Sequence, residues 1–327
     1  MALTRDSLEW AIDFIGEHSD GDLFPKLKEL KAIKDNSTDF IDLIEGKQLT
    51  SFKPKSCRRF IVPKDEISYR QATQLHPQDS IILSAIIYQY GQNIEDRRLS
   101  DQEVFSYRFS PSLDQGLYNS KNSWNEFWTK ANRKSLTSSV ILYCDIADFY
   151  NQIYHHTVEN QLLASSFPNQ EMKWIISLLE STTAGVSRGV PIGPHAIHLL
   201  AESTLIPIDN SLKTNGMDFL RYADDILIFF KDEKKAKKSL GIVASILDKQ
   251  QRLILQKHKT KIYNAADFRI MCSDMIEDRP ISRQEGALLK VINKYTGGNP
   301  YQTITYNEIK PEDWKKFSAA IVEKIIN

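Results

Sequence analysis

The chain has 327 residues, of which 41% are apolar and 26% charged, and its formal net charge is zero. This apolar content suffices for a real core, in one large domain or in two to three smaller ones. A zero net charge lacks the overall basic excess that is typical of polyanion-binding proteins. No apolar run is long enough to span a bilayer, which argues against a membrane protein.

Three cysteines stand far apart in the sequence, at Cys57, Cys144 and Cys272. Their odd number and wide spacing exclude a disulfide framework and a cysteine-based metal site. The N-terminus lacks a basic-then-apolar signal sequence. We therefore predict a cytoplasmic protein with reduced thiols and no membrane association.

The first fifty residues are acidic, with eleven Asp/Glu against six Lys/Arg, a net charge of −5 that leaves +5 for the remainder. Apolar side chains at helical spacing predict an amphipathic helix near 5–18, namely Leu8, Ala11, Ile12 and Ile15. A second helix is predicted from Pro25 to about Lys34, with proline in its first turn. We interpret 1–50 as an acidic helical extension.

Two short strands joined by a turn are predicted at 57–64 and 68–72, where the sequence is basic and then β-branched. Arg59, Lys64 and Arg70 form a basic set in this segment. Such a set suits a triphosphate, because arginine offers bidentate donors and lysine a point charge. An ordinary charged hairpin is the alternative interpretation of these residues.

A helix is predicted at 75–90, with Asp79 near its start, and 91–137 is an aromatic-rich connection. The apolar run 140–144 ends at Asp145, which predicts a buried central strand with a carboxylate at its C-terminal end. Ligand chemistry in sheets often gathers at such ends. A helix N-cap is the alternative role for Asp145.

Three glycines and two prolines fall within residues 185–194. They predict a loop of special backbone geometry that can approach a ligand closely. A plain connection is the alternative. Helices are predicted on both sides of the loop, at 170–180 and from 195 to about 211, the second with a kink at Pro207.

Tyr222-Ala223-Asp224-Asp225 separates two apolar runs and predicts a tight turn in a β-hairpin. Two adjacent carboxylates repel each other and are costly to desolvate, but a divalent cation between them makes the arrangement favourable. A solvated Asp-Asp turn is the alternative. Beyond it we predict a helix at 232–250, a short strand at 253–255 and two further helices at 284–295 and 311–326.

Asp145 and the Asp224-Asp225 turn are separated by about eighty residues that include the glycine-rich loop. If the two strands are neighbours, three carboxylates converge. Hard oxygen ligands of this kind suit Mg²⁺ or Mn²⁺. Two such ions clamp the attacking and leaving oxygens of an in-line phosphoryl transfer.

Five motifs in this order, over about residues 55–265, together resemble the fingers and palm of reverse transcriptases. They are the basic segment 58–64 with Arg70 and Asp79 behind it, 145–150, 185–194, 222–225, and Lys259-Thr260. The resemblance implies an α+β right-hand polymerase fold. Its parts would be fingers at 51–137, a palm at 138–275 with helices packed on an antiparallel sheet, and a small helical thumb-like region at 276–327.

The resemblance also implies roles for individual residues. Two Mg²⁺ ions, or Mn²⁺, would be held by Asp145, Asp224 and Asp225 together with the Ile146 carbonyl. Lys259 would act as a catalytic acid toward pyrophosphate, and the Tyr150 ring would lie beneath the sugar, exclude a 2′-hydroxyl and so favour deoxynucleotides. The deoxynucleoside triphosphate would be bound by Arg59, Lys64, Arg70, Arg188 and Gly189.

Departures within the second palm motif point to one group of the family. Group II intron and retron enzymes usually have Gln-Gly followed by Ser-Pro, where this chain has Arg188-Gly189 and Gly193-Pro194. The chain is more similar to bacterial defence-associated reverse transcriptases, including the abortive-infection type. This similarity implies an RNA-directed DNA polymerase in antiphage defence, with an RNA template or noncoding RNA and a second protein or further copies of the chain as partners.

The sequence leaves two alternative functions open. One is a retron or group II intron-like enzyme that copies its own RNA. The other is a catalytically idle palm that serves as a nucleic-acid-binding assembly module. Keeping three like charges together without using them would be a stability liability, which argues against the idle palm.

Overall fold

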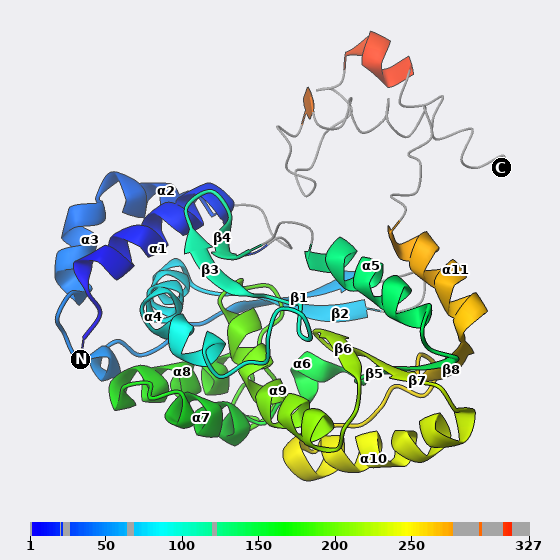
Figure 1. The fold of residues 1–327 in the computed structure, drawn as a ribbon. Helices are drawn as coiled ribbons and strands as arrows, with labels where there is room; N and C mark the ends of the chain where they lie inside the picture. The colour runs from blue at the N-terminus through cyan, green and yellow to red at the C-terminus, as the bar shows by residue number, and fades with distance from the viewer. Residues whose placement is uncertain are drawn as a thin grey trace.

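A computed structural model describes residues 2–19, 21, 27–63, 69–119, 123–276, 294–295 and 310–315. In this part of the chain, helices pack around small antiparallel sheets, which confirms the predicted α+β class (Figure 1). Lys64 lies outside the described residues. The helices predicted at 284–295 and 311–326 lie largely outside them as well.

The N-terminal region forms three helices and a 3-10 turn: α1 (Arg5–His18), α2 (Lys28–Asp35), α3 (Ser37–Ile44) and η1 (Leu49–Ser51). Helix α1 confirms the predicted first helix, and its apolar face is buried. This face packs against α4 (Pro77–Glu95), and both helices contribute to one hydrophobic core. Residues 1–50 therefore share their core with the segment that follows them.

The two predicted basic strands pair as an antiparallel hairpin, β1 (Arg58–Pro63) with β2 (Tyr69–Gln74). The hairpin is tied to the glycine-rich loop by a hydrogen bond from the Thr73 N–H to the Ile192 carbonyl at 2.7 Å. A second, short hairpin of β3 (Phe109–Ser112) and β4 (Gly116–Tyr118) lies in the stretch that was expected to be connective. Strands of three to four residues are too short for a clear alternation in the sequence.

The central sheet has four antiparallel strands in the order β6 (Phe219–Tyr222), β7 (Asp225–Phe230), β5 (Val140–Asp145) and β8 (Lys261–Asn264). Helices cover both of its faces, which explains why β5 and β7 are continuous apolar runs. Ile226 and Ile228 share a core with α10 (Glu233–Gln251). Leu227 and Phe229 alternate to the other face, against α5 (Ser123–Ser135) and α11 (Ala265–Ile276).

Four more helices connect these parts: α6 (Phe149–Gln152), α7 (His155–Ala164), α8 (Asn169–Thr182) and α9 (Ile197–Thr214). Helix α9 packs on α10 and continues through Pro207. Among the described residues, no helix is both long and apolar enough to cross a membrane.

The strand predicted at 253–255 is wrong. This segment makes a single bridge, from Leu255 to Ile146, and the fourth strand of the sheet is β8. Leu253 instead closes the C-terminus of α10, where Arg252 is left-handed with φ 56°. The Arg252 N–H bonds the Asp248 carbonyl at 2.9 Å, which is the hydrogen bond of an αL cap, and the Leu253 N–H bonds the Leu247 carbonyl at 3.2 Å. Both leucines are buried by this cap.

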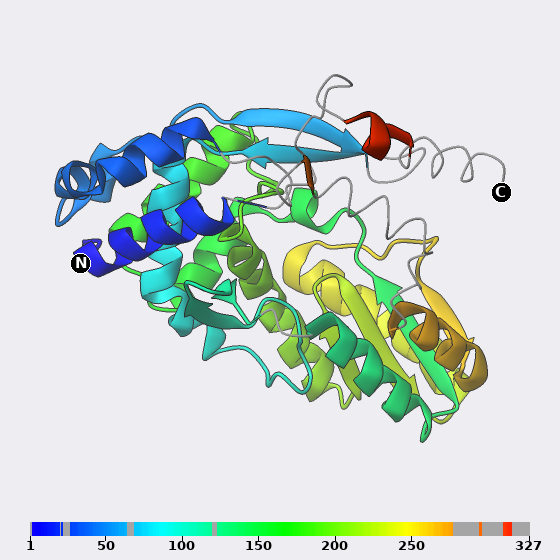
Figure 2. The same cartoon turned by 90° about the horizontal axis from the view of Figure 1, so that it is seen from above.

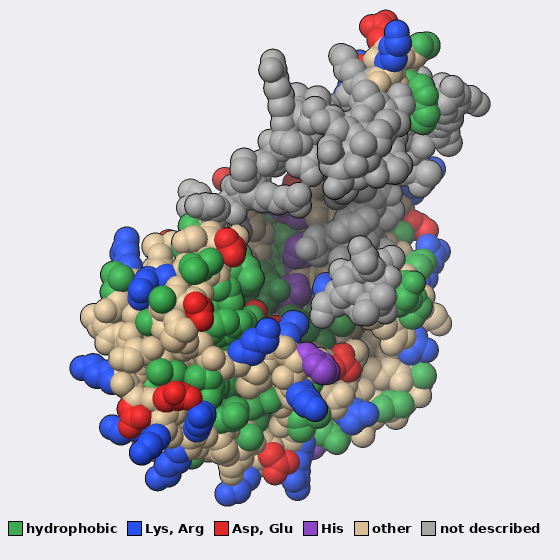
Figure 3. Space-filling model, turned by 90° about the vertical axis from the view of Figure 1, so that its right-hand side faces the viewer, with side chains coloured by type: hydrophobic (Ala, Val, Ile, Leu, Met, Phe, Trp, Pro, Cys, Tyr) green, Lys and Arg blue, Asp and Glu red, His purple; other side chains and the backbone are tan. Residues whose placement is uncertain are grey.

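Figure 2 shows the β1–β2 hairpin along one side of the molecule and the central sheet on another. The face seen in Figure 3 is hollowed near its middle, and histidine and hydrophobic side chains are visible in the hollow. Basic side chains gather below it on the same face.

Candidate active site

Strand register brings the predicted carboxylates to one end of the central sheet. Asp145, the last residue of β5, is paired directly with Asp225, the first residue of β7. Asp224 lies in the two-residue turn that precedes Asp225, and its carbonyl accepts a hydrogen bond from the Ile146 N–H at 3.1 Å. The two strands are therefore neighbours, and their paired ends bring these three residues to one end of the sheet.

Two neighbouring side chains, Tyr143 and Lys259, form hydrogen bonds with the aspartates of this cluster. Tyr143 donates a hydrogen bond of 2.7 Å to Asp225 Oδ1. Burial raises the pKa of Asp225 to about 6, and the nearby charges of Asp224 and Asp145 act in the same direction. Burial lowers the pKa of Lys259, but its hydrogen bond to Asp145 Oδ2, at 2.7 Å, and the negative charges of the three aspartates together outweigh burial and raise the pKa.

The donor chemistry at this sheet end fits a divalent cation. Carboxylate oxygens are the ligands that Mg²⁺ and Mn²⁺ prefer, and the Lys259 ammonium already supplies a positive charge beside Asp145. The described residues nevertheless contain no group of three or more His, Cys, Asp or Glu side chains already spaced to hold a metal ion. The site thus matches a divalent cation in the type of its residues and in their proximity to one another.

The turn itself has an unusual backbone. Ala223 has φ 50°, a left-handed conformation that costs an L-residue about 1–2 kcal/mol. Two side chains hold it there. The Ala223 N–H donates to Ser106 Oγ at 2.9 Å, and Arg221 donates to the Ala223 carbonyl at 3.0 Å. Both the N–H and the C=O of the strained residue are therefore fixed by side chains.

A buried ionic network supports these two side chains. Arg221 has no exposed surface and bonds Asp209 at 2.6 and 2.7 Å and Glu202 at 3.0 and 3.2 Å. Glu202 also accepts hydrogen bonds from Ser106 at 2.7 Å and from Arg98 at 2.8 Å. Burial disfavours the charge of Glu202, but the two arginines outweigh it and lower its pKa.

Sequence reasoning missed this network. The signal that was available is the seven-residue spacing of Glu202 and Asp209 in α9, which places both acids on one helix face. Arg221, immediately before the predicted turn, is the matching cation. Two acids and two arginines balance in charge, which is the condition for ionised groups to be buried together.

Tyr150, the predicted sugar gate, is anchored at two points. The Val190 N–H of the glycine-rich loop bonds its carbonyl at 2.9 Å, and its hydroxyl lies 2.6 Å from His198 Nδ1. Burial raises the pKa of Tyr150 well above its ordinary value, with Tyr107 and the charge of Asp224 acting in the same direction. The Tyr150 side chain therefore lies close enough to the acidic turn for the charge of Asp224 to affect its pKa.

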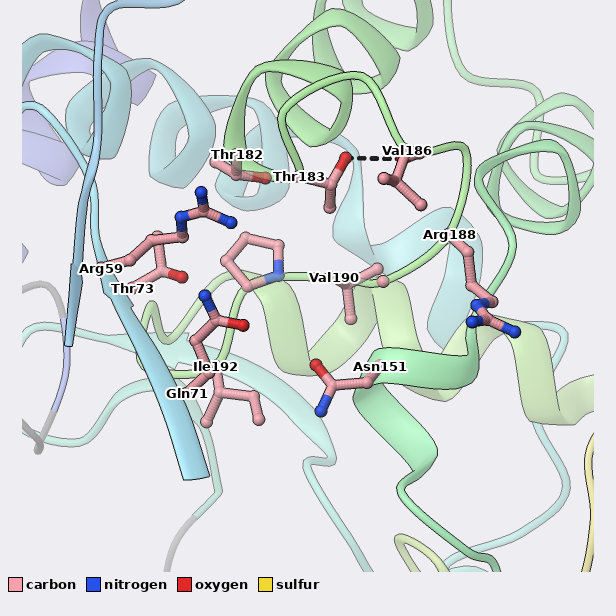
Figure 4. Close-up of a pocket in the computed structure, with 12 residues that line it drawn as sticks. Arg59, Gln71, Thr73, Asn151, Thr182, Thr183, Val186, Arg188, Val190 and Ile192 are labelled. Atoms are coloured by element: carbon pink, nitrogen blue, oxygen red, sulfur yellow. Dashed lines mark hydrogen bonds between the residues drawn. The ribbon is translucent and has the colours of Figure 1, made fainter. Parts of the chain in front are cut away.

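Three of the predicted triphosphate-binding residues, Arg59, Arg188 and Gly189, line one cavity of about 280 Å³. It lies between the β1–β2 hairpin and the glycine-rich loop, with Arg59 on the hairpin side and Arg188 opposite (Figure 4). Gly189 has φ 100°, which favours glycine, and its carbonyl is 2.8 Å from His155 Nε2.

The predicted basic set is divided by the hairpin. Arg59 is paired with Thr73 and Arg70 with Val62. Because successive side chains point to opposite faces of a strand, Arg59 and Arg70 lie on opposite faces. Thr73 lines the cavity together with Arg59, so Arg70 points away from that side. The structure therefore joins Arg59 with Arg188 but not with Arg70.

Comparison with known proteins gives one family match. Residues 62–297 match the family described as reverse transcriptase (RNA-dependent DNA polymerase). A comparison with curated protein sequences gave no match.

Two solved telomerase structures are similar to the chain. Apo telomerase from Candida tropicalis is 11% identical, with a TM-score of 0.47 over 73% of this chain and 50% of that one. Telomerase from Candida albicans in complex with the TWJ fragment of telomeric RNA is 13% identical, with a TM-score of 0.46 over 72% of this chain and 46% of that one. The chain thus spans about half the length of these telomerase chains.

Proposed function

The chain belongs to the reverse transcriptase (RNA-dependent DNA polymerase) family, and on this premise we propose that it extends a DNA strand on an RNA template. One observation carries the proposal: Asp145 is paired with Asp225 beside the Asp224 turn, inside the matched segment. An acidic cluster at a sheet end suits metal-assisted phosphoryl transfer.

The acidic residues and Lys259 have different proposed roles at the reacting phosphate. Asp145, Asp224 and Asp225 would hold two Mg²⁺ or Mn²⁺ ions, with the Ile146 carbonyl as a further ligand. Bound there, such ions would supply activation of the attacking 3′-hydroxyl and stabilisation of the charge on the phosphate and the leaving group. The Lys259 ammonium, which lies 2.7 Å from Asp145 Oδ2, would be placed to give a proton to the leaving pyrophosphate.

The cavity between the β1–β2 hairpin and the glycine-rich loop is the proposed binding site for the nucleotide. Arg59 and Arg188 place two guanidinium groups at its rim, where bidentate hydrogen bonds to phosphate oxygens are available. Gly189 lets the backbone approach the ligand. Arg70, on the opposite face of the hairpin, and Lys64 remain further proposed contacts.

Primer extension tests the proposed activity directly. The protein is incubated with an RNA template, a DNA primer, labelled deoxynucleotides and Mg²⁺, and the products are resolved by length. We expect template-dependent extension that stops when EDTA is added. A protein that binds the template and primer but leaves the primer unextended with either Mg²⁺ or Mn²⁺ would favour the idle nucleic-acid-binding module.

A further part of the proposal is a role for this polymerase in bacterial antiphage defence. Its support is the sequence of the glycine-rich loop, where Arg188-Gly189 and Gly193-Pro194 replace the residues usual in intron and retron enzymes. Expression of the wild type in a bacterial host should lower phage plaque counts, and Asp224→Asn should not. Equal plaque counts with and without the protein, over a panel of phages, would refute this role.

An RNA partner, in addition to a second protein or copy of the chain, also belongs to the proposal. Sequencing the nucleic acid that copurifies with the protein identifies the RNA. One structured RNA encoded beside the gene would favour the retron or intron-like alternative. A mixture of cellular RNAs would favour a polymerase that accepts templates from elsewhere.

A further inference from the structure

His198 and Tyr150 form a directional contact at the proposed sugar gate. The Tyr150 hydroxyl is 2.6 Å from His198 Nδ1, and the two rings are perpendicular at 90°, with centroids 5.8 Å apart. The partly buried Tyr150 keeps its hydroxyl proton and is able to donate it to Nδ1, and the Tyr107 side chain is a second hydrogen-bond partner of Tyr150. A tyrosine ring fixed at its hydroxyl as well as at its backbone has little freedom to swing.

His198 is in turn held by a third ring. Tyr107 stacks flat on the His198 imidazole, with centroids 4.1 Å apart and planes within 4°. His198 lies in the first turn of α9, so the helix fixes the backbone end of the imidazole. The stack fixes the plane of the imidazole, and within that plane Nδ1 faces the Tyr150 hydroxyl.

Tyr118 connects this stack to the start of α9. Its hydroxyl donates to the His195 carbonyl at 2.7 Å and accepts the Leu199 N–H at 3.1 Å. Its ring packs edge-on against Tyr107 at 5.4 Å. The orientation of His198 is therefore set by packing and hydrogen bonds on several sides.

We propose that His198 is a positioning residue which fixes the Tyr150 ring and thereby sets the discrimination between deoxyribonucleotides and ribonucleotides. The inference rests on the proposed polymerase function and on Tyr150 as its gate. A ring held at its hydroxyl presents a fixed wall to a 2′-hydroxyl. A ring released from His198 rotates and lets ribonucleotides enter more often.

The test measures kcat/KM for a deoxynucleotide and for the matching ribonucleotide, and takes their ratio for each variant. Tyr150→Phe keeps the ring and removes the hydroxyl. His198→Phe keeps a flat ring for Tyr107 to stack on and removes the acceptor, whereas His198→Asn keeps a side-chain acceptor. His156→Phe makes the same change at an exposed histidine and is the matched control.

Loss of one buried hydrogen bond predicts that Tyr150→Phe and His198→Phe each lower the ratio by about five- to tenfold. The double variant should be no worse than Tyr150→Phe alone, because that change already removes the contact with His198. His198→Asn should recover most of the ratio, and His156→Phe should match the wild type. A purely structural role for His198 would lower thermal stability and leave the ratio unchanged.

Tyr150→Ala separates the two levels of the proposal. If it lowers the ratio while Tyr150→Phe and His198→Phe stay within twofold of the wild type, the gate stands and the role of His198 is refuted. If Tyr150→Ala leaves the ratio unchanged, the gate is refuted and the role of His198 with it. No incorporation by the unmodified protein would overturn the polymerase function itself.

Discussion

Arg221 precedes the acidic turn, and its guanidinium lies entirely inside the protein. It donates to the Ala223 carbonyl and to two buried acids, so the backbone of the turn is fixed from beneath. Buried ion pairs of this kind contribute little net stability compared with apolar packing. We infer that their value here is geometric, because they keep Asp224 and Asp225 in one arrangement.

Glu202→Gln should destabilise the protein by about 3–5 kcal/mol, because two buried arginines each lose one of the charges that compensate them. The variant should also lose polymerase activity, since Ser106 and Arg221 no longer hold the turn. Glu233→Gln is the matched control, because it breaks an exposed pair with Lys237 and should cost less than about 0.5 kcal/mol. Urea denaturation measures both changes, and equal effects of the two variants would contradict the account.

The sequence predicted the residues of the site, but it did not predict the side chains that hold them in place. Asp145, Asp224 and Tyr150 stand out because each follows an apolar run or closes a short motif. Ser106 and His198 lie in segments without such a pattern, and they reach the site only through tertiary contacts. A sequence shows which groups are chemically unusual, whereas the contacts between distant segments come from the fold.

Elements were predicted best where both faces are covered. Strands β5 and β7 appear in the sequence as unbroken apolar runs, because helices lie against each side of the sheet. The run at 253–255 has the same composition but closes the end of a helix, since the left-handed Arg252 turns the chain back onto Leu247. Periodicity over three residues cannot separate a strand from such a cap.

The start of α4 contains a buried carboxyl that gives a pH-dependent prediction. Asp79 is 1% exposed, and burial raises its pKa to about 6. A carboxyl whose pKa is higher in the folded state binds more protons when folded, so its contribution to stability falls as pH rises from about 4 to beyond 6. Asp79→Asn removes this titration and keeps an acceptor for the Lys55 N–H.

The melting temperature of Asp79→Asn, relative to the wild type, should therefore increase by several degrees between about pH 4.5 and pH 7.5. Asp39→Asn makes the same change at an exposed acid in the first turn of α3 and is the matched control. Calorimetry over this pH range measures both variants. A constant difference for Asp79→Asn would mean that burial does not perturb this carboxyl.

At the scale of the whole molecule, one apolar core runs from α1 through α4 to the central sheet. The family match begins at residue 62, yet the helices before it are packed into the same core. The amphipathic pattern predicted α1 as a helix but gave no information about its partner. Helix pairing depends on which faces meet in space, and α1 meets α4 about sixty residues further along the chain.

Leu8→Ala should cost about 2–5 kcal/mol, because it leaves a cavity between α1 and α4. Glu9→Ala changes the neighbouring, exposed side chain and should stay within about 0.5 kcal/mol of the wild type. Urea denaturation followed by circular dichroism measures both. An accessory extension without a shared core would show no difference between the two variants.

The most direct measurement of the central claim is incorporation of labelled deoxynucleotides by Asp224→Asn. This change removes one negative charge from the acidic turn and keeps the size of the side chain. Asp218→Asn is the matched control, because Asp218 is exposed just before β6 and pairs with Lys134. We predict that Asp224→Asn lowers the incorporation rate roughly 100-fold or more, whereas Asp218→Asn keeps it. Wild-type incorporation by Asp224→Asn would contradict the assignment of this turn as the catalytic centre.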